Sequence, residues 1–118
     1  MKRTERGKFG EDVAVRWLEG KGIKILAKNF RVRGGEVDLV AQEGDVLAFV
    51  EVKTGRSGAF GPPESWVTPR KRRHLVRAAR AYLAKNPWDG EVRFDVVAVE
   101  VRGDEVHVRH LRDAFRPE

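Results

Sequence analysis

The sequence contains no cysteine, so disulfide bonds and thiolate metal sites are excluded. A reducing cytoplasm is therefore the expected compartment. No apolar run approaches the roughly 20 residues of a membrane span, so we expect no membrane partner. Residues 1–12 are charged and lack an apolar segment, which argues against a secretory signal peptide. The 118 residues suffice for one globular domain covering 1–118 and are too few for two.

Acidic residues are missing from one stretch, residues 69–85. This stretch carries seven positive charges, whereas the net charge of the whole chain is only +6, so the rest of the chain is slightly negative. The cations are Arg70, Lys71, Arg72, Arg73, Arg77, Arg80 and Lys85. Such clustering is typical of a surface that faces a polyanion such as nucleic acid. The alternative is an ordinary solvated helix face.

Hydrophobic periodicity and turn residues predict the element order α-β-β-β-α-β-β. Helices are expected over 5–20 and from Pro69, capped by Thr68, to about Lys85. The first would bury Phe9, Val13, Ala14, Trp17 and Leu18, and the second Leu75, Ala78, Ala79, Tyr82 and Leu83. Strands are expected over 23–33, with an interruption near Lys28 and Asn29, and over 36–42, 46–53, 91–101 and 105–111. The predicted fold is α/β, a mixed sheet flanked by helices.

The most apolar stretch, residues 34–53, contains three unexpected charges: Asp38, Glu51 and Lys53. If Glu43 and Gly44 form a two-residue turn, Gln42 pairs with Asp45, Asp38 lies opposite Phe49, and Glu36 lies opposite Glu51. Directly opposed residues share a face, so Asp38, Glu51 and Lys53 would converge with Glu36 at the margin. The conclusion depends on the register, because a turn one residue longer would reverse the faces.

Two carboxylates so close together repel each other unless a cation neutralises them. A hard divalent ion such as Mg²⁺ or Mn²⁺ suits one or two carboxylates together with waters and a phosphate. A neighbouring lysine can position the attacking water or stabilise charge on phosphorus, so the set is suited to phosphodiester hydrolysis. The alternative from spacing alone is that Lys53 simply pairs with Glu51 or Asp38 at a strand end.

Two further positions allow two interpretations each. Glu11 lies at the border of the apolar side of the first helix, where it can reach the same end of the sheet or merely complement the helix dipole. Trp66 can stack on a base or anchor its loop. Gly7 and Gly10 are expected to let the first helix approach the sheet or a phosphate closely.

Four segments carry a family resemblance: GKFGEDVAVRWLEGKGIKILAKNFR, GGEVDLVAQEGDVLAFVEVKTGR, FGPPESWVTPRKRRHLVRAARAYL and RFDVVAV. Together they resemble the YraN-type family of uncharacterised bacterial proteins. That family is similar to the PD-(D/E)xK superfamily, which includes restriction endonucleases and Holliday-junction resolvases. The resemblance implies a restriction-endonuclease-like α-β-β-β-α-β core, here followed by a C-terminal strand.

The resemblance also implies roles for individual residues. Asp38 and Glu51 would be metal ligands, Glu11 a third ligand, and Lys53 the catalytic lysine. The role of Glu36 stays open. Nucleic-acid contacts would fall to Arg56, Arg70, Lys71, Arg72, Arg73 and Arg77, which give affinity for phosphates but no sequence specificity.

The sequence thus predicts a metal-dependent endonuclease acting on structured, including branched, DNA. A homodimer is expected if both strands are cut symmetrically. The alternative from another class is a non-catalytic nucleic-acid-binding module that keeps the nuclease fold and works with recombination or repair partners. A third, weaker alternative is RNA as the substrate.

Overall fold

The computed structural model describes residues 3–117, and its element order is the predicted one. The elements are α1 (Arg3–Gly20), β1 (Lys24–Val32), β2 (Gly35–Glu43), β3 (Val46–Arg56), the 3-10 turn η1 (Pro63–Ser65), α2 (Pro69–Lys85), β4 (Val92–Arg102) and β5 (Glu105–Leu111). The main boundary difference is β3, which runs three residues beyond the predicted end at Lys53 because it stays paired with β4 as far as Arg56.

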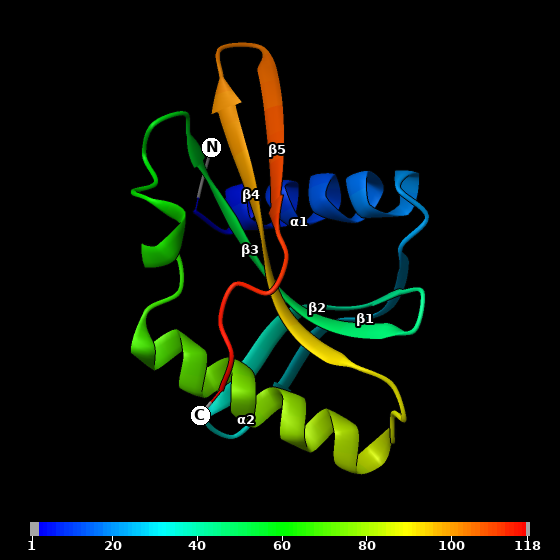
Figure 1. Cartoon of the computed structure of the whole chain (residues 1–118). Coiled ribbons are helices and arrows are strands. Elements are labelled where there is room, and N and C mark those ends of the chain that lie inside the picture. The colour runs from blue at the N-terminus through cyan, green and yellow to red at the C-terminus, as the bar shows by residue number, and fades with distance from the viewer. Residues whose placement is uncertain (1–2, 118) are drawn as a thin grey trace.

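The strands form one mixed sheet in the order β1-β2-β3-β4-β5 (Figure 1). Only β3 and β4 are parallel, and α2 lies in the connection between them. Parallel neighbours need such a crossover. As predicted, Thr68 caps α2: its side chain accepts a hydrogen bond from the Lys71 amide at 3.2 Å, and Pro69 occupies the first turn.

Two apolar clusters cover opposite faces of the sheet. Successive residues of β3 alternate between them: Phe49 packs in the cluster that contains α2, and Val50 in the cluster that contains α1. In β4, Val96 and Val97 divide in the same way. This alternation follows from strand geometry and explains why the centre of β4 is continuously apolar. The predicted inward sides of both helices are confirmed.

The predicted turn between β2 and β3 is wrong by one position. The turn residues are Gly44 and Asp45, Glu43 pairs with Val46, and the pairing continues to Leu39 opposite Val50. Gly44 has φ 59°, and glycine is favoured at the first position of a hairpin turn that needs positive φ. The true register therefore differs by two residues from the predicted one, which changes the partners but preserves the faces.

Two glycines allow the helices to approach the sheet closely. A Cβ on Gly10 would lie 1.7 Å from Oγ1 of Thr54 in β3, as expected for a close helix–sheet contact. A Cβ on Gly35 would lie 2.8 Å from the backbone nitrogen of Ala78, which brings α2 onto the start of β2. The similar expectation that Gly7 brings α1 close to the sheet is wrong, because nothing lies within 4 Å of a Cβ placed there; the alternative of an approach to a phosphate stays a prediction.

Within residues 3–117, neither helix is long and apolar enough to cross a bilayer.

Candidate functional site

Asp38 and Glu51 face each other where β2 and β3 separate. Backbone pairing between the two strands ends at Leu39 and Val50, and the next pair in that register would be Asp38 and Glu51. Here the Asp38 carboxylate accepts a hydrogen bond from the Val52 amide at 2.7 Å, in place of a strand carbonyl. The predicted convergence of the two carboxylates is therefore present, with a directly opposed pair in place of a diagonal one.

The surroundings of Asp38 oppose its ionisation. Burial, reinforced by the charge of Glu51, raises the pKa of Asp38 from 3.8 to about 7, and the hydrogen bond from Val52 only partly offsets this. Glu51 is itself buried, with 7% of its surface exposed. Two carboxylates that share a partly buried position in this way favour binding of either a proton or another cation.

The cation that contacts this pair is Lys71 of α2. Its ammonium lies 2.6 Å from the Glu51 carboxylate. Burial alone would lower the pKa of Lys71, but the hydrogen bond to Glu51 and the charges of nearby carboxylates together outweigh it and raise that pKa. Sequence reasoning placed Lys71 among the phosphate contacts and missed this role, because the approach of α2 to β3 is a tertiary feature.

Lys53 shares the strand face of Glu51 but does not pair with either carboxylate. Its ammonium lies 3.5 Å from the Trp66 carbonyl and 5.3 Å from the centre of the Phe60 ring. The alternative in which Lys53 forms a simple ion pair at a strand end is therefore not observed. Lys53 is thus a second cation on the strand face of Glu51, and its ammonium contacts the loop after β3.

Glu11 lies near the pair without joining it. It accepts a hydrogen bond from the Asn29 side chain at 2.7 Å and makes a minor contribution to the raised pKa of Asp38. Asn29 falls opposite Asp38, because its neighbours Lys28 and Phe30 pair with Leu39 and Val37. Asn29 also has φ 51°, unusual for a strand residue other than glycine. β1 nevertheless continues through Asn29, and its register shift lies between Ile25 and Ala27, so the interruption predicted near Lys28 and Asn29 is present only as the unusual backbone of Asn29. Asn29 links α1 to the site.

The donor set fits a hard divalent cation as a two-carboxylate site. Asp38 and Glu51 supply oxygen ligands of the type that Mg²⁺ and Mn²⁺ take, with the other positions left for water and phosphate. Within residues 3–117, no group of three or more His, Asp or Glu side chains is arranged to hold a metal. Glu11 therefore does not complete a three-ligand set in this structure.

A pocket of about 270 Å³ opens beside Glu51, and α2 forms one wall; Asp38 is not among its lining residues. It is lined by Glu36, Glu51, Thr68, Arg70, Lys71, His74 and Leu75. We call it the acidic pocket. Glu36 sits at its margin, as expected, and pairs with Arg31 at 3.5 Å on the surface.

Of the other cations predicted to bind nucleic acid, Arg70 lines the acidic pocket as well, and the rest lie elsewhere. Arg72, Arg73 and Arg77 line a different groove on α2, and Arg56 is exposed at the end of β3. Trp66 anchors its loop: only 4% exposed, it donates a hydrogen bond to the Gly61 carbonyl at 2.8 Å. It is therefore not placed to stack on a base.

A second carboxylate cluster, which sequence reasoning missed, lies on the α1 face. Asp95 accepts hydrogen bonds from Arg93 (2.8 and 2.9 Å), from Nε2 of His110 (2.8 Å) and from the Asp113 amide (3.0 Å). Glu43 accepts bonds from Arg93 and Arg112. We call this group the Asp95 network.

The fold and this site define the class of protein. The chain is an α/β protein whose element order is consistent with the α-β-β-β-α-β core of nuclease-like proteins, and its acidic pair lies where β2 and β3 separate. The comparisons with known sequences add the family. The chain belongs to Uncharacterised protein family UPF0102, whose family model matches residues 10–99.

Curated relatives align over almost their full length. A UPF0102 protein of Geobacter metallireducens is 46% identical over 110 residues, covering 92% of this chain and 90% of the relative. UPF0102 protein FP2501 of Flavobacterium psychrophilum is 42% identical, covering 95% and 94%. A UPF0102 protein of Syntrophomonas wolfei is 46% identical, covering 94% and 97%. The expected resemblance to a family of uncharacterised bacterial proteins is thus confirmed.

Proposed function

We propose that the protein is a divalent-metal-dependent endonuclease that hydrolyses phosphodiester bonds in structured DNA, branched forms included. The observation that carries this proposal is the Asp38–Glu51 pair, in which the pKa of Asp38 is raised to about 7 beside a basic helix. A carboxylate whose pKa is strongly perturbed, next to a pocket, is a candidate for a functional site. We further propose a cytoplasmic location, in keeping with a chain that has no cysteines.

Each residue then has a chemical task. Asp38 and Glu51 hold Mg²⁺ or Mn²⁺, which would supply Lewis-acid activation and charge neutralisation at the phosphate. Lys71 is the cation nearest to Glu51 and is placed to move from that carboxylate to a phosphate oxygen. Lys53 offers a second ammonium on the same face. Glu11, held by Asn29, orients the surroundings of Asp38 from the side of α1.

A specific observation also favours the alternative, a nucleic-acid-binding module that does not cleave. Lys71 already neutralises Glu51 at 2.6 Å, and no three-ligand cluster exists within residues 3–117. A site neutralised by its own lysine needs no metal to be stable. In that case the basic helix would still bind nucleic acid, with a steep dependence on salt and none on divalent ions.

The decisive experiment measures cleavage of labelled linear, flapped and four-way-junction DNA, and of RNA, in Mg²⁺ and in Mn²⁺. Wild type is compared with Asp38→Asn and Glu51→Gln, and Glu19→Gln, an exposed change on α1, is the matched control. Loss of a direct ligand should reduce cleavage by more than about 100-fold, because even outer-shell changes at metal sites cost up to about that much.

Mn²⁺ binding by calorimetry provides a readout that does not depend on turnover. We expect it to be lost in both site variants and kept in the control. Metal binding that survives both changes would overturn the assignment of the site. Metal-independent nucleic-acid binding with no cleavage in any divalent ion would favour the alternative.

A further inference from the structure

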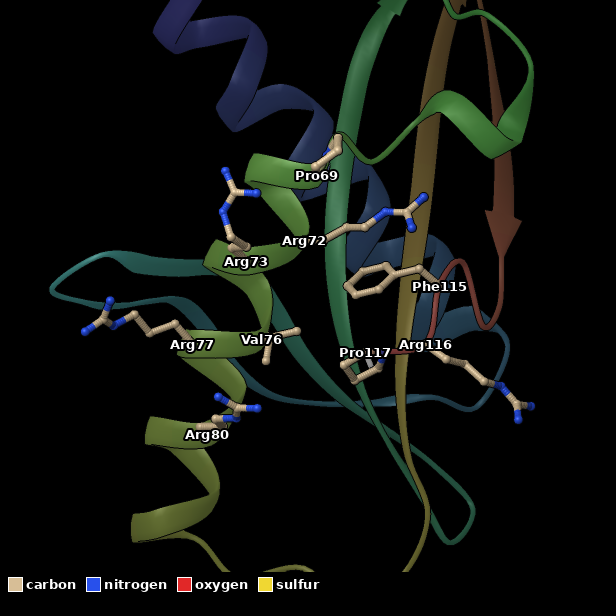
Figure 2. Close-up of a pocket in the computed structure, with 9 residues that line it drawn as sticks. All are labelled: Pro69, Arg72, Arg73, Val76, Arg77, Arg80, Phe115, Arg116 and Pro117. Carbon is tan, nitrogen blue, oxygen red and sulfur yellow. The ribbon is translucent and has the colours of Figure 1, made fainter.

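A second groove, larger than the acidic pocket, runs along the other side of α2. Its volume is about 720 Å³, and it separates α2 from the C-terminal segment 115–117 (Figure 2). The lining residues are Pro69, Arg72, Arg73, Val76, Arg77, Arg80, Phe115, Arg116 and Pro117. Five of them are arginines, and none of these described lining residues is acidic. We call it the arginine groove.

Two of the five arginines are already engaged in holding the fold. Arg72 donates a hydrogen bond to the Val67 carbonyl at 3.0 Å and lies 5.2 Å from the centre of the Phe115 ring. Arg116 pairs with Asp113 at 3.0 Å. Phe115 is only 7% exposed and stacks on Phe94, so it closes the floor of the groove and leaves no ring face for a base.

The other three arginines are available to a ligand. Arg73, Arg77 and Arg80 are exposed, and within residues 3–117 none of them forms an ion pair. Figure 2 shows the three side chains spaced along α2. Exposed guanidinium groups without a carboxylate partner are suited to bidentate contacts with phosphate.

The spacing of this row suits consecutive phosphates. From Arg73 to Arg80 is seven residues, which at about 1.5 Å per residue gives a row of roughly 10 Å. A nucleic-acid strand carries one negative charge per nucleotide, so a row of this length can contact neighbouring phosphates of the same strand. A protein partner with scattered carboxylates has no such regular repeat.

The helix keeps the arginine groove apart from the acidic pocket. Arg70, Lys71 and His74 line the acidic pocket, whereas Arg73, Arg77 and Arg80 line the groove. No lining residue is shared. The cations of α2, which look like a single basic segment in the sequence, are therefore divided between two surfaces.

We propose that the arginine groove is a separate site for the phosphodiester backbone of a nucleic-acid strand, on the opposite side of α2 from the acidic pocket. The inference rests on the proposed function for the identity of the polyanion, but not on cleavage. The groove holds a part of the strand away from the reacting phosphate. It contributes affinity without sequence specificity, because its cations address only phosphates.

The test measures binding of labelled single-stranded DNA, single-stranded RNA and duplex DNA in EDTA, as a function of salt between about 50 and 200 mM. Arg77→Gln/Arg80→Gln is compared with Arg16→Gln/Lys24→Gln, which removes the same charge at exposed positions on α1 and β1. Losing two phosphate contacts should reduce the slope of log affinity against log salt by about 1.8 for a duplex or about 1.4 for a single strand. The control should change the slope little.

A second measurement works on the wild-type chain. Backbone amide shifts on adding the metal-free oligonucleotide should concentrate in residues 72–80 and 114–116. Equal slopes for the groove and control variants, or shifts confined to the acidic pocket, would overturn the proposal. Competition by inorganic tripolyphosphate as effective as that of the oligonucleotide would also overturn it, since the groove would then be a small-anion site.

The proposals for the arginine groove and for the acidic pocket can be refuted separately. Asp38→Asn should abolish Mn²⁺ binding and leave the slope of log affinity against log salt unchanged. Arg77→Gln/Arg80→Gln should keep Mn²⁺ binding and reduce that slope. If the protein never cleaves but the slopes behave as stated, the proposed endonuclease activity fails and the arginine groove stands. If the protein cleaves but the groove and control variants have equal slopes, the proposed endonuclease activity stands and the proposal for the arginine groove fails.

Discussion

The sheet carries a carboxylate cluster on each face, and the two are neutralised to very different extents. At Asp95, burial raises the pKa, but hydrogen bonds from His110 and Arg93 outweigh it and the pKa ends below its usual range. At Asp38, burial also raises the pKa, and the nearest charge is another carboxylate, so the pKa reaches about 7. Burial acts in the same direction at both aspartates, and the neighbouring groups decide the outcome.

The difference fits a structural role for the Asp95 network and the proposed metal-binding role for the Asp38–Glu51 pair. The Asp95 network joins β4 to β5 and, through the Asp113 amide, to the C-terminal segment, so its ion pairs hold elements together. The Asp38–Glu51 pair also links elements, since Asp38 accepts a hydrogen bond from the Val52 amide and Glu51 pairs with Lys71 of α2, but it leaves a carboxylate partly protonated at neutral pH. An unfavourable pair of this kind within the core sheet fits the proposed cation site.

The largest expected effect comes from removing the carboxylate of Asp95, which its neighbours neutralise. Asp95→Ala leaves Arg93 and His110 buried without their shared acceptor, and their side chains are only 14% and 3% exposed. Removing one partner of a buried charge pair costs about 3–5 kcal/mol of unfolding free energy. Urea denaturation followed by circular dichroism measures it.

A variant that fails to fold would agree with this expectation, and Asp95→Asn, which keeps an acceptor oxygen, provides a measurable intermediate. A loss below about 1 kcal/mol in Asp95→Ala would show that the network is not structural, because exposed ion pairs contribute that little.

The second-largest expected effect is a gain in stability, and it comes from replacing Asp38. Asp38→Asn keeps an oxygen for the Val52 amide and removes the charge beside Glu51. We expect the variant to be more stable than wild type by roughly 1–3 kcal/mol at pH 8 in EDTA, since each unit of pKa shift corresponds to about 1.4 kcal/mol. Thermal or urea unfolding at fixed ionic strength measures the difference.

The pH dependence of this difference tests its cause. The folded state binds the Asp38 proton more tightly than the unfolded chain, so wild-type stability falls as pH rises from 3.8 towards about 7 and levels off above that. The advantage of Asp38→Asn should therefore shrink towards zero near pH 4. The hydrogen bond from Arg112 lowers the pKa of Glu43 to about 2, so protonation of Glu43 reduces the stability of the protein only in acid. This contribution is the same in both proteins and cancels from the difference. An advantage that stays constant with pH would show that packing, and not charge, distinguishes the variant.

The contrast between the two clusters was only partly accessible from the sequence. Hydrophobic periodicity gave both helices and all five strands, because apolar repeats reflect which face packs. Asp38 and Glu51 stood out because charges are rare within apolar strands. The turn between their strands was misplaced by one residue, yet a two-residue shift in pairing keeps side chains on the same face, so the convergence survived the error.

The contacts around these carboxylates could not be predicted in the same way. Lys71 meets Glu51 across 20 residues, and the approach depends on Gly35 admitting α2 onto β2. Glu43 meets Arg112 across 69 residues. Such contacts depend on strand order and helix placement, which periodicity does not encode. The position of Asn29 did leave a local signal, the break in alternation near Lys28, although its link to Glu11 did not.

The smallest effect concerns Lys71, the cation that pairs with Glu51. Lys71→Gln removes the ammonium 2.6 Å from Glu51 and frees that carboxylate for a divalent ion. We expect Mn²⁺ to bind roughly 3- to 10-fold more tightly without nucleic acid, because a unit charge about 4 Å away is worth about 1 kcal/mol in water. Calorimetric titration measures the change in Mn²⁺ affinity.

Arg70→Gln is the matched control, since Arg70 lines the same acidic pocket and forms no ion pair with the residues of 3–117. An equal gain in both variants would mean that Mn²⁺ responds only to the general positive field of α2. A loss in Lys71→Gln alone would mean that the lysine holds Glu51 in place for the metal. A gain in Lys71→Gln alone would mean that the lysine competes with the metal for Glu51, so that a phosphate which attracts Lys71 would also promote metal binding.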